Sequence, residues 1–266
     1  MVNGRIMAIA LVTGPTSGLG RGYARALARK GFDLVLVSRS QGDLLREADE
    51  ITNLYGVNCE VLVADLSSRD DIERVEGRLR DADRPISVLV NNAGFGLKTS
   101  FARSTVADEQ ALLDVLVTAV MRLTRAVLPG MLDRGAGWIV TVSSVASWFP
   151  GGSYSAAKAW ATTFSESMSV ELRGTGVRAI AVCPGFVRTE FHARADMNMS
   201  GTPDWMWLSV DDVVDRTWRD LALGKSTSVA SIRYRAVALA LRRGPSVIGK
   251  SITHVRQRGS GMGARR

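Results

Sequence analysis

Residues 6–20 read Ile-Met-Ala-Ile-Ala-Leu-Val-Thr-Gly-Pro-Thr-Ser-Gly-Leu-Gly and decide the fold. The apolar run Ile6–Thr13 predicts a buried strand, and the pattern over Leu19–Lys30 predicts a helix directly after it. Glycines between them would allow a tight turn and a close backbone approach, with the helix N-terminus facing a phosphate. Such a turn can be purely structural, but between a first strand and a first helix it indicates a dinucleotide site. The residues predicted to form that site are Gly14, Thr16, Ser17, Gly18, Leu19 and Gly20.

Short β-branched runs alternate with longer helical patterns along the rest of the chain. Further strands are expected at Asp33–Ser38, Cys59–Ala64, Ile86–Asn91, Gly137–Ser143, Val177–Cys183 and Ser226–Ile232. Further helices are expected at Gly42–Tyr55, Ser68–Ala82, Asp108–Asp133, Tyr154–Arg173 and Asp211–Leu223. Because the strand runs are apolar at nearly every position, both faces of the sheet should be covered. The sequence therefore predicts an α/β fold, a single Rossmann-type doubly wound parallel sheet of about seven strands with helices on both faces.

We expect two parts, a catalytic domain over residues 1–232 and a basic C-terminal helix and tail over 233–266. Within the first part, Met and Trp residues among polar ones predict a lid at about 189–209 with a short amphipathic helix. A packed excursion that caps the core is the alternative. Much of the net charge of +8 lies in the tail, which has no acidic residue. A basic amphipathic helix would lie on an anionic membrane surface, or it would be solvated or packed in a dimer.

The composition excludes several other classes of protein. The hydrophobic content of 46% is ordinary for a globular chain of 266 residues, and no window is long and apolar enough to span a membrane. We therefore expect a cytoplasmic protein, with peripheral membrane contact as an open addition. Two cysteines, Cys59 and Cys183, and two histidines make a metal site improbable. No zinc-knuckle spacing or aromatic RNA-binding signature is present, so no specific nucleic-acid partner is expected.

The end of the second predicted strand bears on cofactor choice. A carboxylate there would accept hydrogen bonds from the ribose 2′-hydroxyl of NAD, whereas an arginine accommodates the 2′-phosphate of NADP. The chain has Ser38-Arg39 and no carboxylate at this point. Arg39 can pair with a phosphate in a bidentate manner, so the sequence predicts NADP(H). The alternative is an exposed arginine at a strand end.

Residues 153–158 read Ser-Tyr-Ser-Ala-Ala-Lys at the start of a predicted helix. The spacing puts Tyr154 and Lys158 on one helix face, about one turn apart. A phenol has a pKa near ~10, so proton transfer at neutral pH would need a cation such as Lys158 nearby. Ser144, at the end of the preceding strand, could hold a substrate oxygen against the tyrosine. The plainer interpretation is a half-buried ring beside a solvated amine.

With these motifs in order, residues 6–225 strongly resemble the short-chain dehydrogenase/reductase family. The matching residues are the Thr13–Gly20 turn, Asp65-Leu66, Asn91-Asn92-Ala93-Gly94, Ser143-Ser144, the Tyr154 and Lys158 pair, and Pro184-Gly185 followed by Thr189. The resemblance implies catalytic roles for Ser144, Tyr154 and Lys158. It implies that the cofactor is held by the glycine turn, Arg39, Asp65, Leu66, Asn92, Ala93, Gly94, Tyr154, Lys158, Pro184, Gly185, Val187 and Thr189.

The roles that the resemblance implies are specific. Asp65 would contact the adenine, and residues 92–94 would lie beneath the ribose and nicotinamide. Residues 184–189 would bind the nicotinamide carboxamide. A carbonyl carbon would accept a hydride from the cofactor while Tyr154 protonates the oxygen, with Ser144 holding the carbonyl. Lys158 would bind the ribose and depress the pKa of Tyr154.

Two departures from the family pattern stand out. Ser144 and Tyr154 are ten positions apart, fewer than is usual in the family, so the loop Val145–Ser153 should leave a more open pocket. Ser143 or Ser147 are alternatives to Ser144. Leu116 stands where the family normally has an asparagine that anchors a water of the proton relay. Either another group or bulk solvent completes the relay, or catalysis is slow.

The sequence therefore predicts an NADPH-dependent oxidoreductase acting on a carbonyl or secondary alcohol. The apolar lid favours a lipophilic substrate, such as a 3-oxoacyl lipid, a steroid-like ketone or a long-chain aldehyde. The alternatives are an NADP⁺-dependent alcohol dehydrogenase running towards oxidation, and a cofactor-binding scaffold or redox sensor with little turnover. The helix predicted at Asp108–Asp133 is apolar over much of its circumference, so a homo-oligomer is also expected.

Overall fold

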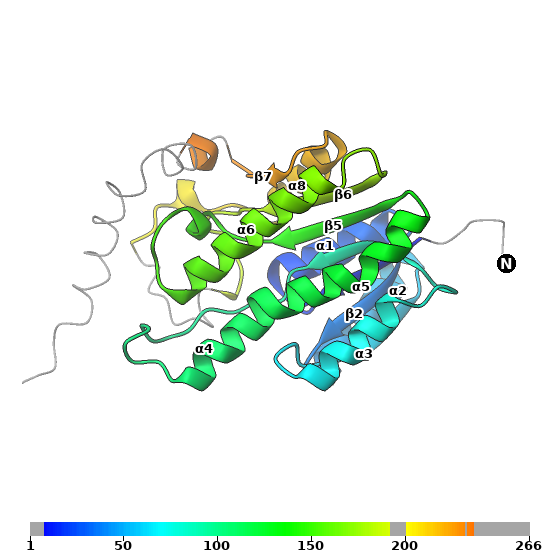
Figure 1. The fold of residues 1–266 in the computed structure, drawn as a ribbon, viewed down its shortest axis with the longest axis horizontal. Helices are drawn as coiled ribbons and strands as arrows, with labels where there is room; N and C mark the ends of the chain where they lie inside the picture. The colour runs from blue at the N-terminus through cyan, green and yellow to red at the C-terminus, as the bar shows by residue number, and fades with distance from the viewer. Residues whose placement is uncertain (1–7, 192–200, 232, 237–266) are drawn as a thin grey trace, which may run out of the picture.

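The computed structural model describes residues 8–191, 201–231 and 233–236. Its centre is a parallel sheet in the order β3-β2-β1-β4-β5-β6-β7 (Figure 1). The strands are β1 (Ile9–Thr13), β2 (Asp33–Ser38), β3 (Cys59–Val63), β4 (Ile86–Asn91), β5 (Gly137–Val142), β6 (Val177–Val182) and β7 (Thr227–Ser228). The predicted doubly wound parallel sheet is confirmed.

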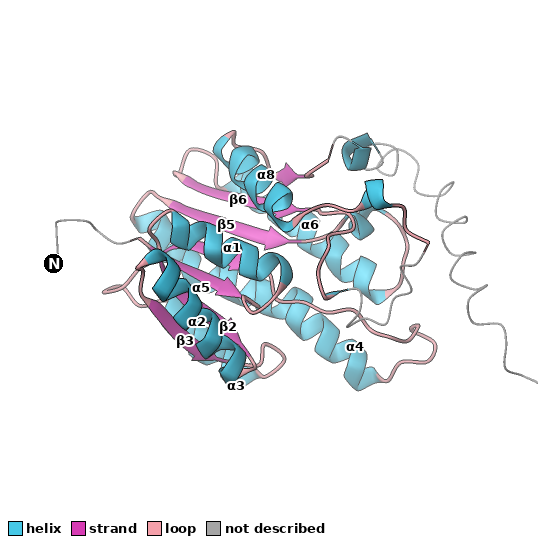
Figure 2. Cartoon of the chain, turned by 180° about the vertical axis from the view of Figure 1, so that it is seen from behind, coloured by secondary structure: helices cyan, strands magenta, loops and turns pink. Residues whose placement is uncertain are grey.

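Helices cover both faces of this sheet (Figures 1 and 2). One face carries α1 (Gly18–Arg29), α2 (Gln41–Tyr55) and α8 (Val210–Ala222). The other face carries α3 (Arg69–Leu79), α5 (Ala119–Asp133) and α6 (Ser153–Glu171), and α4 (Val106–Leu113) leads into α5. Strand β1 shows why both layers form, because Ala10 and Val12 pack into the α1 layer while Leu11 packs into the α5 layer.

The strand order places a ligand crevice at one point of the sheet. Strand β1 lies between β2 and β4, so the chain winds outwards in opposite directions from β1. In open α/β sheets, ligands bind beyond the carboxyl ends of the strands at such a switch point. The glycine-rich turn follows β1 and the Asn91–Gly94 segment follows β4, so the fold brings these two motifs together.

The structure differs from the sequence prediction in two elements. The single helix expected over Asp108–Asp133 is divided, because a π-helical turn at Asp114–Thr118 joins α4 to α5. The strand expected over Ser226–Ile232 pairs with β6 only at Thr227 and Ser228. After these two residues, Val229 packs into a small core cluster instead of continuing the sheet.

Part of the expected lid, residues 192–200, and most of the basic tail, residues 237–266, lie outside the described residues. Among the helices that the structure describes, none has the length and apolar character needed to cross a membrane.

Candidate active site

The glycine-rich turn after β1 is locked to the segment after β4. The Asn92 side-chain Nδ2 donates hydrogen bonds to the carbonyl oxygens of Thr13 and Gly14 at 2.9 and 3.0 Å. In return, the Thr13 hydroxyl accepts from the backbone N–H groups of Asn92 and Ala93 at 2.9 and 3.0 Å. A Cβ at Gly20 would lie 1.9 Å from the Gly14 carbonyl oxygen, so only glycine allows this turn to close onto the helix.

The N-terminus of α1 has the features of a phosphate site. Ser17 occupies the N-cap but its side chain makes no capping hydrogen bond. By contrast, α2, α3 and α8 each begin with a serine whose hydroxyl accepts from a first-turn N–H, at Ser40, Ser68 and Ser209. The first N–H groups of α1 therefore suit an anion, together with the helix dipole. The residues present fit the pyrophosphate of a dinucleotide.

Thr16 and Leu19 are fixed by contacts with the rest of the α1 layer. The Thr16 carbonyl accepts a hydrogen bond from Arg21, and the Arg21 guanidinium also forms an ion pair at 2.8 Å with the buried Glu47 of α2. The Leu19 side chain packs against the core of the α1 layer. Thr16 is thus held in place from α2, and the core contact of Leu19 fixes the start of α1.

Arg39 lies just beyond β2 with 75% of its side chain exposed. Its Nη1 is 3.9 Å from the carboxylate of Asp65, which follows β3. Asp65 also accepts hydrogen bonds from the backbone N–H and hydroxyl of Ser67. The side chain of Leu66 packs into the core instead. Arg39 and Asp65 thus lie together beyond the carboxyl ends of β2 and β3.

Tyr154 and Lys158 lie on the first turns of α6. The Lys158 ammonium is 5.7 Å from the centre of the Tyr154 ring and donates a hydrogen bond to the Val142 carbonyl oxygen at 2.7 Å. Lys158 is buried, whereas Tyr154 is only half-buried. The Tyr154 ring also lies 5.8 Å from the ring of Phe191, centre to centre. The lysine is therefore anchored at the end of β5, close to the ring of Tyr154.

Burial dominates the electrostatics of this pair. It raises the pKa of Tyr154 above its usual value, and hydrogen bonding to Ser144 lowers that pKa only in part. It lowers the pKa of Lys158 to about 8, while the neighbouring Cys183 acts in the opposite direction. The expectation that Lys158 depresses the pKa of Tyr154 is not met, because the desolvation of the phenol outweighs the other effects. A raised pKa keeps the phenol protonated at neutral pH, as a proton donor requires.

The three candidate serines differ in their surroundings. The Ser143 hydroxyl is buried, donates to the Lys158 carbonyl oxygen at 2.8 Å and shares a hydrogen bond with Thr162 at 2.7 Å. The Ser144 hydroxyl is partly exposed and accepts from the Ala146 N–H at 3.1 Å, at the start of a 3₁₀ turn over Val145–Trp148. The Ser147 hydroxyl is buried without a hydrogen-bond partner. Only Ser144 is within hydrogen-bonding reach of Tyr154.

Leu116 lies on the π-helical turn and is 1% exposed. It packs in an apolar cluster with Leu112 and Ala157, against which the Tyr154 ring also lies. It also lies against Gly94. An apolar wall therefore stands where the family pattern would have an asparagine.

The segment after β6 contains the remaining predicted residues. The Pro184 carbonyl accepts from the Val145 N–H at 3.0 Å, and Val187 forms an isolated parallel bridge with Leu208. Thr189 reaches the glycine turn, because a Cβ at Gly18 would lie 3.0 Å from its methyl group.

Gly185 has a neighbour that its sequence motif does not predict. The ring of Tyr234 covers it, although Tyr234 comes some fifty positions later in the chain. The one available signal was an aromatic residue at the start of an otherwise basic segment.

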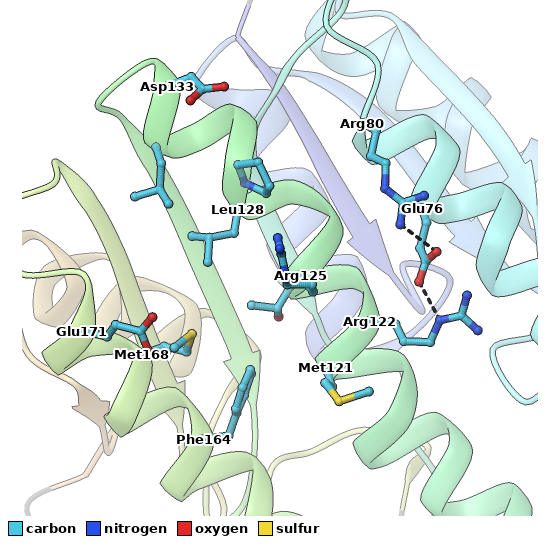
Figure 3. A pocket seen from close by; sticks show the side chains of 13 residues that line it. Glu76, Arg80, Met121, Arg122, Arg125, Leu128, Asp133, Phe164, Met168 and Glu171 are labelled. Atoms are coloured by element: carbon cyan, nitrogen blue, oxygen red, sulfur yellow. Dashed lines mark hydrogen bonds and ion pairs between the residues drawn. The ribbon is translucent and has the colours of Figure 1, made fainter.

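A separate groove of about 760 Å³ lies between α3, α5 and α6 (Figure 3). Apolar and charged side chains line it together, and Glu76 accepts hydrogen bonds there from Arg80 and Arg122 at 3.0 and 2.6 Å. None of the predicted site residues lines this groove. It is thus distinct from the crevice at the carboxyl end of the sheet.

Comparison with known proteins agrees with this geometry. Residues 8–199 match the short chain dehydrogenase family. The chain is 38% identical over 189 residues to a very-long-chain 3-oxoacyl-CoA reductase of Anas platyrhynchos, covering 68% of this chain and 60% of that protein. It is 38% identical over 188 residues to sulfoacetaldehyde reductase 2 of Chromohalobacter salexigens, covering 69% of this chain and 74% of that protein. The chain thus spans less than two thirds of the length of the first of these relatives.

A solved structure resembles the whole chain. The short-chain dehydrogenase of Sphingobium yanoikuyae in complex with NADPH superposes with a TM-score of 0.81 at 30% identity, covering 97% of this chain and 99% of that one. The family match, the parallel sheet and the ordered motifs lead to one conclusion: this chain belongs to the short-chain dehydrogenase family of oxidoreductases.

Proposed function

We propose that this protein is an NADPH-dependent reductase of lipophilic carbonyl compounds. The observation that carries the proposal is that three groups gather beyond the carboxyl ends of the parallel strands. These are the uncapped helix N-terminus at Ser17, the exposed Arg39, and the Ser144, Tyr154 and Lys158 side chains. NADPH bound there would supply a hydride to the carbonyl carbon of the substrate.

The chain's own residues would then handle the oxygen of the substrate. Ser144 donates a hydrogen bond that holds the carbonyl, and Tyr154 gives it a proton as negative charge develops. Lys158 is fixed by the Val142 carbonyl, and its remaining N–H groups would bind the ribose hydroxyls. The proposed cofactor contacts are Arg39 with the 2′-phosphate and Asp65 with the adenosine. Residues 92–94 would lie beneath the nicotinamide ribose, and Val187 and Thr189 would lie beside the carboxamide.

The lipophilic substrate is inferred from the side chains around Tyr154. Leu116 belongs to the apolar cluster against which Tyr154 packs, Phe95 and Leu97 pack against the same cluster, and the ring of Phe191 lies beside that of Tyr154. The name of the oxoacyl-CoA reductase relative favours the same class of substrate, whereas that of the sulfoacetaldehyde reductase favours a small anionic aldehyde.

The test is NADPH oxidation measured over 2-ketones and 3-oxoacyl thioesters of graded chain length, with sulfoacetaldehyde in the same panel. The proposal expects kcat/KM to rise with chain length. A preference for sulfoacetaldehyde would overturn the substrate class, and NADPH binding with no turnover on any member would favour the scaffold alternative. Leu116 is the observation that supports that alternative, because it removes a polar group from the expected relay.

We also propose that the protein forms a homo-oligomer through the groove between α5 and α6. Met121 and Leu132 on α5 are 44% and 40% exposed, and both line the groove. On α6, Trp160 and Phe164 stack with their ring centres 4.7 Å apart. Two copies packed on this face would bury these side chains.

A further inference from the structure

The start of the C-terminal segment docks on the wall of the candidate cofactor site. A helical turn that contains Arg233 and Tyr234 lies next to the segment 201–208 (orange and yellow in Figure 1). Tyr234 is 7% exposed, although it is surrounded in the sequence by arginines. The burial of one aromatic side chain in a basic segment indicates a specific contact.

The Tyr234 ring occupies the space above Gly185. A Cβ built at Gly185 would lie 2.0 Å from Cζ of this ring and 2.3 Å from two of its other atoms. The φ angle of Gly185 is not in the left-handed region, so the backbone conformation does not require glycine here. Glycine is needed because the phenol ring packs directly on the backbone.

The Tyr234 hydroxyl joins two separate segments. It accepts a hydrogen bond from the Phe186 N–H at 3.1 Å and donates one to the Met206 carbonyl oxygen at 2.9 Å. Beside it, the Arg233 guanidinium donates to the Trp205 carbonyl oxygen at 3.1 Å and lies 5.4 Å from the centre of the Trp205 ring. We call Arg233 and Tyr234 the C-terminal clasp.

The two segments under the clasp are also paired with each other. The Leu208 N–H donates to the Phe186 carbonyl oxygen at 2.8 Å, and the Arg188 N–H donates to the Leu208 carbonyl oxygen at 3.1 Å. Arg188 forms an ion pair with Asp204 at 2.7 Å. A displacement of residues 205–208 would therefore move residues 186–188 with them.

The chain runs from this paired region directly into the candidate carboxamide pocket. Val187 is 4% exposed, and Thr189 touches the glycine turn at Gly18. The segment 185–189 thus lies between the clasp at one end and the phosphate turn at the other. Its position depends on both contacts.

We propose that Tyr234, supported by Arg233, is a positioning residue that holds the segment 185–189 against the nicotinamide of the bound cofactor. This inference rests on the proposed NADPH site. It assigns a task within the catalytic domain to residues at the start of the basic C-terminal segment. Tyr234 itself acts through the Phe186 N–H and the packing on Gly185, and it touches no reacting atom.

The first experiment measures amide hydrogen exchange in the full chain without nucleotide. Tyr234→Phe keeps the ring but removes the acceptor for the Phe186 N–H, so exchange at Phe186 should accelerate at least about five-fold. Arg235→Ala, a change at an exposed arginine of the same turn, should leave that rate unchanged. Unchanged exchange at Phe186 in Tyr234→Phe would overturn the clasp whatever the protein catalyses.

The second experiment measures the NADPH dissociation constant, KM and kcat of the same variants. Tyr234→Phe should raise the dissociation constant and KM for NADPH about five- to ten-fold, with a smaller change in kcat at saturation. Faster exchange with unchanged NADPH affinity would overturn the positioning role. Absence of NADPH binding by the unaltered chain would instead overturn the proposed function on which this inference rests.

A double substitution separates positioning from simple loss of stability. Gly185→Ala should weaken NADPH binding more than ten-fold, because its methyl group meets the Tyr234 ring. Tyr234→Ala removes the ring, so adding Gly185→Ala to it should cause little further loss, and the two effects should be strongly non-additive. If Gly185→Ala weakens NADPH binding equally in the unaltered chain and in Tyr234→Ala, the Tyr234 ring is not what requires glycine at position 185. That result would overturn the proposal.

Discussion

Leu116 lies against Gly94, where a Cβ at position 94 would be 2.8 Å from Leu116 Cδ2 and 3.7 Å from the Lys158 ammonium nitrogen. An apolar side chain and a buried cation thus border the same small space behind the candidate site. Leu116 belongs to the π-helical turn that divides the long helix, and such turns occur often at functional sites. The surroundings of Lys158 therefore limit how a proton could reach Tyr154.

Leu116→Asn should raise turnover, because an amide at this place can hold a water beside Lys158. Burial of the amide should also destabilise the fold by about 1–3 kcal/mol. Steady-state kinetics and thermal unfolding measure the two effects. Leu112→Asn, in the same apolar cluster, is the control and should lower stability without raising turnover. If turnover of Leu116→Asn does not rise, the missing polar group does not limit the reaction.

Tyr154→Phe should lower kcat by at least ~10²-fold, the lower end of the usual contribution of general acid catalysis. The NADPH dissociation constant should change little, because the ring remains in place. Stopped-flow turnover and fluorescence titration with NADPH measure the two quantities. Tyr55→Phe, at the far end of α2, provides the matched control. Turnover near the normal rate in Tyr154→Phe would refute the proton-donor role.

Arg39→Asp should raise KM for NADPH strongly and KM for NADH little, because the ion pair with the 2′-phosphate is replaced by repulsion. Arg29→Asp makes the same charge change at the C-terminal end of α1, away from the crevice, and should affect neither cofactor. Kinetics with both cofactors checks this. Equal effects of Arg39→Asp on NADPH and NADH would contradict the NADP(H) assignment.

The rate of reduction should fall as the pH rises through about 8, because Lys158 loses its proton there and no longer binds the ribose as a cation. A stability effect of the opposite sign should accompany it. Lys158 has a folded-state pKa below its unfolded value of 10.5, so the unfolded chain binds more protons between about 8 and 10.5. Lys158 therefore makes the free energy of unfolding increase with pH in that window.

Denaturant unfolding at pH 7.5 and 9.5 tests this assignment. In Lys158→Met, the free energy of unfolding should rise less between these two pH values than in the unaltered chain. Other titrating groups, such as Cys59, contribute equally to both proteins, so their effect cancels in the comparison. Identical pH dependence in both proteins would show that Lys158 is not the group concerned.

Leu132→Glu should shift the protein to a smaller species, because it places a charge at an exposed leucine that lines the groove. Light scattering after size-exclusion chromatography measures the mass. Leu54→Glu, at an exposed leucine of α2 on the opposite face of the sheet, should leave the mass unchanged. An unaltered chain that is already monomeric would contradict the oligomer proposal.

The sequence by itself determined the sheet and much of the candidate site. Apolar runs without alternation, as at β1, require helices on both faces, and the motifs follow strands whose carboxyl ends meet at one edge. These patterns predict the Gly14–Gly20 turn, whereas Asn92 and the Ser144, Tyr154 and Lys158 group are expected beside it from the resemblance to the short-chain dehydrogenase/reductase family.

Only the tertiary structure decided the contacts that depend on packing between distant segments. The π-helical turn at Leu116, the core hydrogen bonds of Ser143 and the raised pKa of Tyr154 follow from burial, which a sequence does not display. The same holds for Tyr234, whose ring meets Gly185 across nearly fifty positions. The sequence around Gly185 does not predict this contact, because Tyr234 reaches the space above Gly185 only when the chain folds.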